Sequence, residues 1–239
     1  MQFALDFRPT QQRAIGGGLE GAERNTRETF QWRPPIISPD RQINPVKDEA
    51  DARGRDSIQN DGYAMGALHV HKDSIVGTNY RLNAQPDYEL LGATEEWAER
   101  FQRVVEGRFN LIGDSQDHWF DASRKMTLTE LVRLAVGGFV FTGEVVATAE
   151  WMRAAGRPFS TAIQLVSPTR LSNPDGVSDD KFLRRGVRKN VFGEAVEYYF
   201  QMGFPTDYWM DSSAMTWRAV PARKPWGRRQ VIHIIDPLQ

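Results

Sequence analysis

The spacing of hydrophobic and polar residues changes near the middle of this 239-residue chain. Between residues 45 and 143 apolar side chains recur every three or four positions, which is the period of one face of a helix. From residue 144 onward the period is closer to two, which is typical of strands with one buried face. Helices followed by antiparallel strands predict an α+β fold rather than a doubly wound parallel sheet.

Capping signals mark the ends of the predicted helices. Asn44 followed by Pro45 predicts a helix start, because Asn is a preferred N-cap residue and Pro suits the first helical position. Residues 60–62 read Asn-Asp-Gly and predict a break, after which a second helix ends at Gly77. The segment before residue 78 is therefore predicted to be a pair of helices.

Two further helices are predicted before the strands begin. Thr94 is the expected N-cap of the first, whose apolar stripe we expect to be buried: Trp97, Phe101, Val104, Val105 and Phe109. Thr127 and Glu130 form a capping box at the start of the second, which ends near Gly143.

The strand-like half predicts a hairpin followed by shorter strands. Glu144–Met152 and Phe159–Val166 are β-rich and are joined by a four-residue turn at 154–157. Four more strands are predicted: Gly186–Lys189, Ala195–Met202, Met215–Val220 and Gln230–Ile235.

Residues 1 to about 44 are rich in Gly, Pro, Arg and Gln and predict an extended arm. The Gly16–Gly21 segment matches a dinucleotide-binding pattern, but no strand precedes it, so a flexible linker is the favoured interpretation. The expected organisation is thus an arm at 1–44, a helical part at 45–143 and a β-rich part at 144–239.

Composition excludes several classes of protein. The chain has no Cys, which rules out disulfide scaffolds, iron–sulfur clusters, Cys-ligated zinc and thiol catalysis. Charge is balanced overall, at 30 Lys and Arg against 31 Asp and Glu, but residues 151–239 carry net +5 and residues 1–150 net −6. The chain is therefore predicted to be electrostatically two-sided.

No membrane segment is predicted. The longest apolar stretch, from Leu131 to Ala149, contains Arg133 and Glu144, and the N-terminal residues lack the apolar region of a signal peptide. We expect a soluble intracellular protein.

Acidic and imidazole side chains gather in the connection before residue 123: Asp114, Asp117, His118 and Asp121. Three carboxylates and an imidazole can bind a divalent cation, and metal-dependent nuclease or hydrolase activity is the alternative hypothesis for this chain. The spacing matches no EF-hand or zinc-protease motif, so a solvated loop is favoured.

The other candidate chemistry is weaker. His69 and His71 are two residues apart, which on a helix turns their rings away from each other. His233 lies between apolar residues of a predicted strand and is interpreted as a buried structural histidine. The chain has neither a nucleophile elbow nor a phosphate-binding loop, so we predict no catalytic residue, metal or cofactor.

Basic residues cluster in two segments of the second half: Arg184, Arg185 and Arg188, then Arg223, Arg228 and Arg229. Trp217 and Trp226 are interleaved with the second group. An interface between subunits or an exposed face is favoured, and weak contact with DNA phosphates is the alternative.

A series of short motifs then resembles the lambda family of tailed-phage portal proteins. The motifs occur in the family's order over about residues 30–239: Asp51-Ala52-Arg53-Gly54-Arg55-Asp56, Asn60-Asp61-Gly62-Tyr63-Ala64, Ile75-Val76-Gly77, Met126-Thr127-Leu128-Thr129, Ser167-Pro168, Arg170-Leu171-Ser172-Asn173-Pro174 and Val231-Ile232-His233-Ile234.

The resemblance implies a structural protein without enzymatic activity. Members of that family form a dodecameric ring at one vertex of the virion capsid, through which double-stranded DNA passes during packaging and ejection. The implied partners are other copies of the chain, the terminase large subunit, the major capsid and head-completion proteins, and DNA bound without sequence specificity, with assembly in the host cytoplasm. The residues here would form the wing region, and the family's stem, clip and crown are expected to be absent from them.

Overall fold

The computed structural model describes residues 27, 31, 34–207 and 209–235, and the structural statements below concern these residues. The chain divides into two units, Met1–Ser38 and Pro39–Gln239. The glycine-rich segment of the predicted arm lies outside the described residues. The end of the arm is described and differs from the prediction: residues 39–43 form a short helix, and Asp40 and Asn44 contact the second half of the chain, so this part is not extended. The second unit contains all the helices and strands described here.

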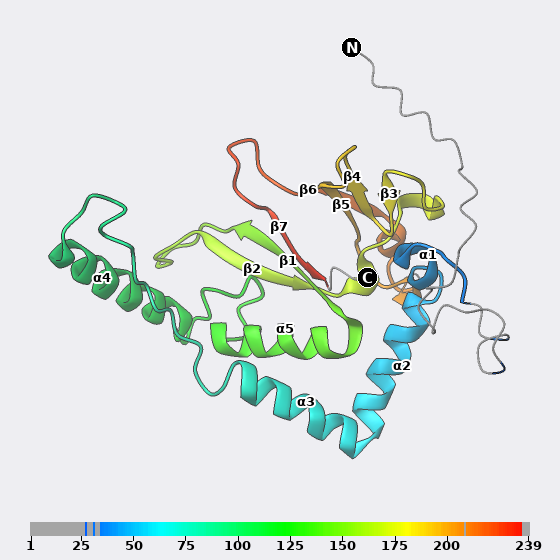
Figure 1. Ribbon diagram of the computed structural model, residues 1–239, viewed down its shortest axis with the longest axis horizontal. Helices are drawn as coiled ribbons and strands as arrows, with labels where there is room; N and C mark the ends of the chain where they lie inside the picture. The colour runs from blue at the N-terminus through cyan, green and yellow to red at the C-terminus, as the bar shows by residue number, and fades with distance from the viewer. Residues whose placement is uncertain (1–26, 28–30, 32–33, 208, 236–239) are drawn as a thin grey trace, which may run out of the picture. The chain divides into compact units, whose positions relative to one another are not determined.

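Helices precede strands in the second unit, which confirms the predicted α+β class (Figure 1). The helices are α1 (Pro39–Ile43), α2 (Lys47–Asn60), α3 (Gly62–Ile75), α4 (Glu95–Gly113) and α5 (Leu128–Thr142). The strands are β1 (Glu144–Trp151), β2 (Thr161–Val166), β3 (Leu183–Arg184), β4 (Val187–Lys189), β5 (Ala195–Gln201), β6 (Trp217–Pro221) and β7 (Val231–Ile235). None of the helices in the described ranges has the length and apolar character needed to cross a membrane.

Most of the predicted caps are confirmed. The side chain of Thr94 accepts a hydrogen bond from the first turn of α4. Asp61 caps α3 in the same way, at a position where the sequence predicted only a break. Thr127 and Glu130 form both halves of the capping box of α5, which ends at Gly143 in the left-handed conformation, with φ of 73°.

The predicted N-cap at Asn44 is wrong. Helix α2 begins at Lys47 after Val46, whose side chain makes no capping hydrogen bond. Asn44 instead follows α1, and its side-chain amide donates to Asp179 Oδ2 at 2.8 Å. The Asn44 side chain, which the local sequence predicted to cap a helix, therefore makes a contact with a residue 135 positions away.

The strands form two antiparallel sheets, with orders β2-β1-β7 and β3-β4-β5-β6. The predicted β1–β2 hairpin is confirmed, with Trp151 opposite Thr161. Its connection is longer than the four predicted residues, because the turn at 154–157 forms only its tip. Strand β3 has two residues, which is too short to produce a recognisable period.

Side chains from both sheets meet in one core. The core joins Val146 of β1 and Val231 of β7 to Val187, Tyr198 and Phe200 of the second sheet. Leu171, only 2% exposed, lies in the same cluster. Burial of these side chains holds the two sheets together.

Helix α5 covers the opposite face of the β2-β1-β7 sheet, and α3 packs on α5 (Figure 1). Helix α2 approaches α5 closely at Gly54, where a Cβ atom would lie 2.9 Å from the carbonyl oxygen of Phe141. A larger residue would therefore push the two helices apart.

The apolar stripe of α4 departs from prediction. Trp97, Phe101 and Val104 are 42%, 40% and 42% exposed in the described chain, whereas Val105 and Phe109 are partly buried. Phe109 packs edge-on against Phe120, with ring centroids 5.7 Å apart. A helical period identifies which face is apolar, but it does not determine how much of that face another element covers.

This difference predicts unequal responses to truncation. Leu131 of α5 is 4% exposed, so Leu131→Ala should lower the free energy of unfolding by about 2–5 kcal/mol through loss of burial and cavity formation. Phe101→Ala, at a position 40% exposed, should cost about 1 kcal/mol or less. Urea denaturation of both variants measures the two values, and a larger loss for Phe101→Ala would show that α4 is buried.

Candidate functional site: a buried charge network between helices and sheets

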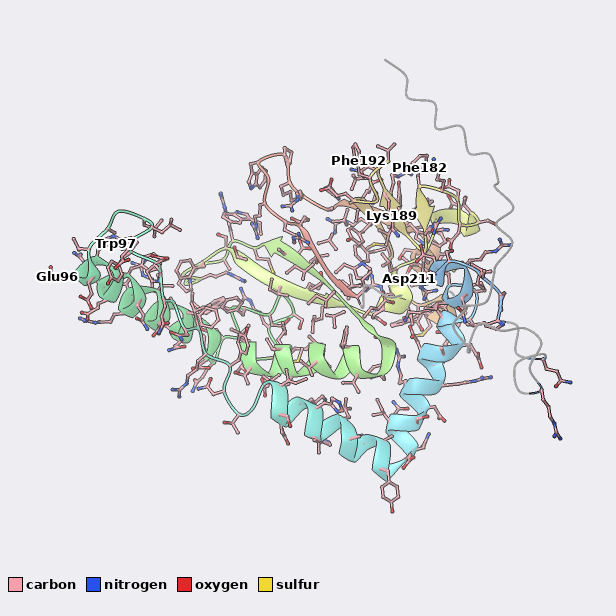
Figure 2. The ribbon with its side chains drawn as sticks, in the orientation of Figure 1. Glu96, Trp97, Phe182, Lys189, Phe192 and Asp211 are labelled. Carbon is pink, nitrogen blue, oxygen red and sulfur yellow. The ribbon has the colours of Figure 1, made fainter. Side chains whose placement is uncertain are left out.

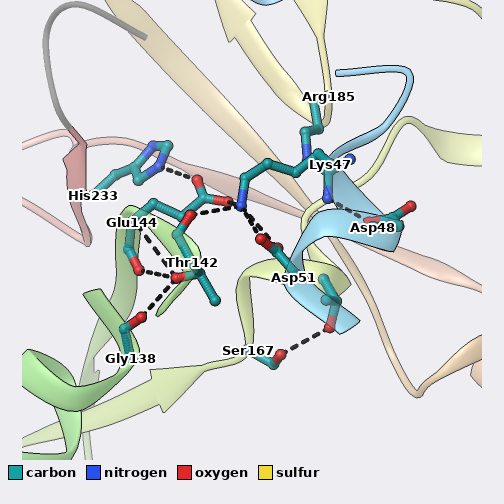
Figure 3. A network of polar contacts seen from close by, with 10 residues as sticks. Lys47, Asp48, Asp51, Gly138, Thr142, Glu144, Ser167, Arg185 and His233 are labelled. Carbon is teal, nitrogen blue, oxygen red and sulfur yellow. Dashed lines mark hydrogen bonds and ion pairs between the residues drawn. The ribbon is translucent and has the colours of Figure 1, made fainter. Parts of the chain in front are cut away.

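The ammonium group of Lys47 lies in the interior, where three elements meet (Figure 3). Lys47 is the first residue of α2 and is 6% exposed. Its Nζ donates to Asp51 Oδ1 and Oδ2 at 2.6 and 2.8 Å and to the Thr142 carbonyl oxygen at 2.8 Å. It also lies 3.1 Å from Glu144 Oε1.

Glu144 extends the network to the far strand of the sheet. Its Oε2 is 3.0 Å from His233 Nε2, which brings β7 into the same group of contacts as β1 and α2. The His233 ring packs edge-on against Tyr198, with centroids 5.6 Å apart, and its side chain is 10% exposed. The interpretation of His233 as a buried structural histidine is confirmed.

A tight turn between α5 and β1 places Glu144 beside Lys47. Thr142 ends α5, and its hydroxyl oxygen accepts from the Glu144 amide at 3.3 Å and lies 2.9 Å from the Gly138 carbonyl oxygen. Gly143 adopts a positive φ that a residue with a side chain rarely adopts. The helix therefore passes directly into β1, and the first side chain of the strand points at Lys47.

The two carboxyl groups beside Lys47 respond differently to burial. For Asp51, burial outweighs the hydrogen bond and charge of Lys47, and its pKa lies above the ordinary value of 3.8. For Glu144, burial also raises the pKa, but the His233 hydrogen bond and the Lys47 charge together exceed that effect, so the net pKa is lowered from 4.5.

Two of the predicted basic residues border this network and have partners within the chain. Arg184 Nη1 lies 2.7 Å from Asp40 Oδ2, and Arg185 forms an ion pair with Asp48. Lys189 shares Asp40 at 3.6 Å. Residues of the acidic and basic halves of the sequence thus meet inside one chain, because α1 and the start of α2 lie against the β3–β4 hairpin.

The remaining basic residues lie on exposed positions or against aromatic rings. Arg188 donates to the Tyr199 hydroxyl at 2.6 Å and lies 3.3 Å from Glu197. Arg228 lies over the Trp151 ring, 5.5 Å from its centroid. Arg223 pairs with Arg229 across the connection from β6 to β7, where both are exposed. The structure therefore groups Arg184, Arg185 and Arg188 on one hairpin, and Arg223, Arg228 and Arg229 on another connection.

The acidic cluster does not converge on a metal position. The carboxylate of Asp121, which is 3% exposed, accepts hydrogen bonds from Ser123, Lys125 and Met126, and these bonds outweigh burial and lower its pKa. Among the residues that the structure describes, no three His, Asp or Glu side chains are grouped as a metal site. The structure thus lends no support to the nuclease or hydrolase alternative that Asp114, Asp117, His118 and Asp121 suggested.

Lys47, Asp51 and Asp179 have structural roles that the sequence did not predict, although Asp51 begins one of the family motifs. An i,i+4 spacing of Lys47 and Asp51 is visible in the sequence, but such pairs are usually exposed. Asp179 accepts from Asn44, from Asn173 and from the Arg185 amide, each at 2.8 Å. These bonds fix the loop before β3, and part of the family motif around Asn173 therefore has a structural role.

The match to known proteins covers nearly the whole chain. Residues 25–239 match the lambda family of phage portal proteins, and the chain belongs to that family. It is 36% identical to the portal protein of Escherichia phage N15 and 35% identical to portal protein B of Escherichia phage lambda, over 225 residues in each case. Each alignment covers 94% of this chain and 40% of the relative, so the chain spans about two fifths of their length.

The opposite pKa shifts of Glu144 and Asp51 predict opposite pH dependences. Above pH 4.5, the ordinary pKa of a Glu side chain, Glu144 is ionised in both the folded and the unfolded protein, and its interactions stabilise the fold. As pH falls through the lowered pKa of the folded protein, protonation of Glu144 removes that stabilisation. The stability difference between wild type and Glu144→Gln should therefore shrink as pH falls from about 6 to about 3.

Asp51→Asn is the matched control, because the folded pKa of Asp51 is raised and its protonation favours the fold. Relative to this variant, wild type should gain stability over the same fall in pH. Chemical denaturation across the pH series measures the stability of each variant relative to wild type. If neither stability difference changes with pH, the opposite pKa shifts of Glu144 and Asp51 are contradicted.

Proposed function

We propose that this chain acts as part of a portal subunit that forms a homo-oligomeric ring at one vertex of the capsid, a dodecamer in the complete protein. The observation that carries the proposal is the match of residues 25–239 to the lambda portal family. In this role the ring is the passage for double-stranded DNA during packaging and ejection. The subunit contributes shape and contacts and has no enzymatic activity of its own.

The proposed partners are other copies of the chain, the terminase large subunit, and the major capsid and head-completion proteins. The proposed location is the portal vertex of the virion, with assembly in the host cytoplasm. The organisation into an arm at 1–44, a helical part at 45–143 and a β-rich part at 144–239 is proposed to correspond to the wing region of the ring.

The use of the ionisable residues supports a structural role. Glu144 and His233, which in other settings serve as acid and base, are committed to a buried contact at 3.0 Å. Asp121 is committed to loop amides. Both groups stabilise the fold, and their positions favour a rigid building block over a substrate cleft.

The basic residues separate into two proposed roles. Arg184 and Arg185 hold the β3–β4 hairpin to the first helices, at 2.7 Å in the case of Arg184 and Asp40. Arg188, Arg223 and Arg229 are exposed, and Arg228 is partly exposed. These four are proposed to serve subunit contacts or weak phosphate contacts, because tight binding to many phosphates would hold DNA in place.

Assembly tests this proposal most directly. We expect the purified chain to form closed rings, measured by light scattering for mass and by electron microscopy for shape. Arg229→Glu should reduce the ring fraction with little effect on thermal stability, since Arg229 is exposed. Arg184→Glu should instead lower thermal stability, because it places a second carboxylate beside Asp40. A chain that stays monomeric at every concentration would contradict the proposal.

A further inference from the structure

One flank of α4 carries an apolar ridge that stays partly exposed in the described chain. The ridge is formed by Trp97, Phe101, Val104 and Leu111, which recur at helical spacing and are 42%, 40%, 42% and 71% exposed. The neighbouring flank is different, because Ile112 is 9% exposed and Phe109 packs on Phe120. The helix thus buries one flank of its apolar face within the chain and leaves the other flank partly exposed.

The exposed ridge is ordered by its own aromatic side chains. The rings of Trp97 and Phe101 stack with centroids 5.2 Å apart and an interplanar angle of 23°. Trp97 lies with Glu96 at the N-terminal end of α4 (Figure 2). Large aromatic side chains that are already held in place are enriched in protein interfaces, because little conformational freedom is lost when they dock.

An apolar groove of about 640 Å³ lies between α5 and the β2-β1-β7 sheet. Its walls come from successive turns of α5 and from the alternate residues of the strands that face it: Leu131, Ala135, Phe139, Ala147, Leu165 and Ile232. Among the lining residues, Phe139, Val140 and Ile234 are 37%, 38% and 54% exposed. This groove is therefore open to solvent within the described residues.

We propose that the α4 ridge of one copy docks into the α5–sheet groove of the next copy. This inference rests on the proposed ring and identifies the surfaces that would close it. A ridge and a groove are different surfaces on one chain, so their contact is heterologous, and heterologous contacts generate rings when the rotation closes. A two-fold dimer would require each surface to match itself, which a ridge and a groove do not do.

Charges at the ends of the two surfaces are complementary. The first turn of α4 carries Glu95 and Glu96. The last turn of α3, which borders the groove through His71 and Ile75, carries Lys72 and Asp73. Asp73 pairs with Arg133 of α5 at 2.6 Å, so Lys72 leaves this end with a net positive charge. Opposite charges at one end of a helix-in-groove contact favour one direction of the helix in the groove. A second copy of the chain would therefore dock in one fixed orientation.

The absence of cysteine from the 239-residue sequence makes the contact testable by disulfide trapping. Phe101→Cys places a thiol on the ridge of one protein. Val140→Cys places a thiol at the mouth of the groove of a second protein, whose mass is increased by a fusion tag. After mixing under mild oxidation, a non-reducing gel separates the mixed disulfide from each homodimer. Because docking holds the two thiols at a high effective concentration, the mixed disulfide should form about tenfold faster than in the control pair.

The control pair is Glu99→Cys with Val140→Cys. Glu99 is exposed on the polar side of the same helix, so collision rates match but docking does not bring its thiol to the groove. Equal rates for the two pairs would overturn the proposed contact. A protein carrying both Phe101→Cys and Val140→Cys that closes a disulfide within the monomer would also overturn it, since α4 would then occupy its own groove.

Light scattering on the same samples separates failure of the contact from failure of the proposed function. Rings without selective trapping would leave the portal proposal standing and show that other surfaces form the ring. Monomers without selective trapping would count against both. When both cysteines are on one chain, selective trapping should give a ladder of linked copies on the gel. That result supports both the contact and the ring.

Discussion

The fold depends on how the buried ammonium of Lys47 is neutralised. An unpaired charge in the interior costs several kcal/mol, so the fold is stable only when carboxylates and carbonyl groups surround that charge. Those groups come from α2, from the turn between α5 and β1, and, through Glu144 and His233, from β7. A single cation thus requires the helical part and one sheet to take a defined relative position.

The same requirement explains how the polar groups of this portal-family chain are distributed. The carboxylates of Asp51 and Glu144 are held in the interior and that of Asp121 at loop amides, while the apolar surfaces of α4 and of the groove beside α5 are partly exposed. The charge asymmetry of the sequence is partly used within one chain, as in the Arg184–Asp40 pair at 2.7 Å. Apolar surfaces, together with the exposed arginines Arg188, Arg223 and Arg229, are the surfaces that we propose for assembly.

Local rules predicted the features that depend on neighbouring residues. The capping box at Thr127, the left-handed Gly143 and the β1–β2 pairing each follow from a few consecutive side chains. Features that depend on distant segments were missed, such as the Asn44–Asp179 hydrogen bond across 135 residues and the partners of Lys47. The amphipathic pattern of α4 was predicted correctly, but its exposure depends on the elements around it, which the period does not encode.

The free energy of unfolding of Lys47→Met tests the central role of this network most directly. Its control is Arg53→Met in the same helix, whose ion pair with Glu49 has side chains 79% and 66% exposed. Lys47→Met leaves Asp51 and Glu144 without their cation and should cost about 3–5 kcal/mol, whereas Arg53→Met should cost about 1 kcal/mol or less. Equal and small losses for the two variants would show that the fold does not depend on the buried ammonium.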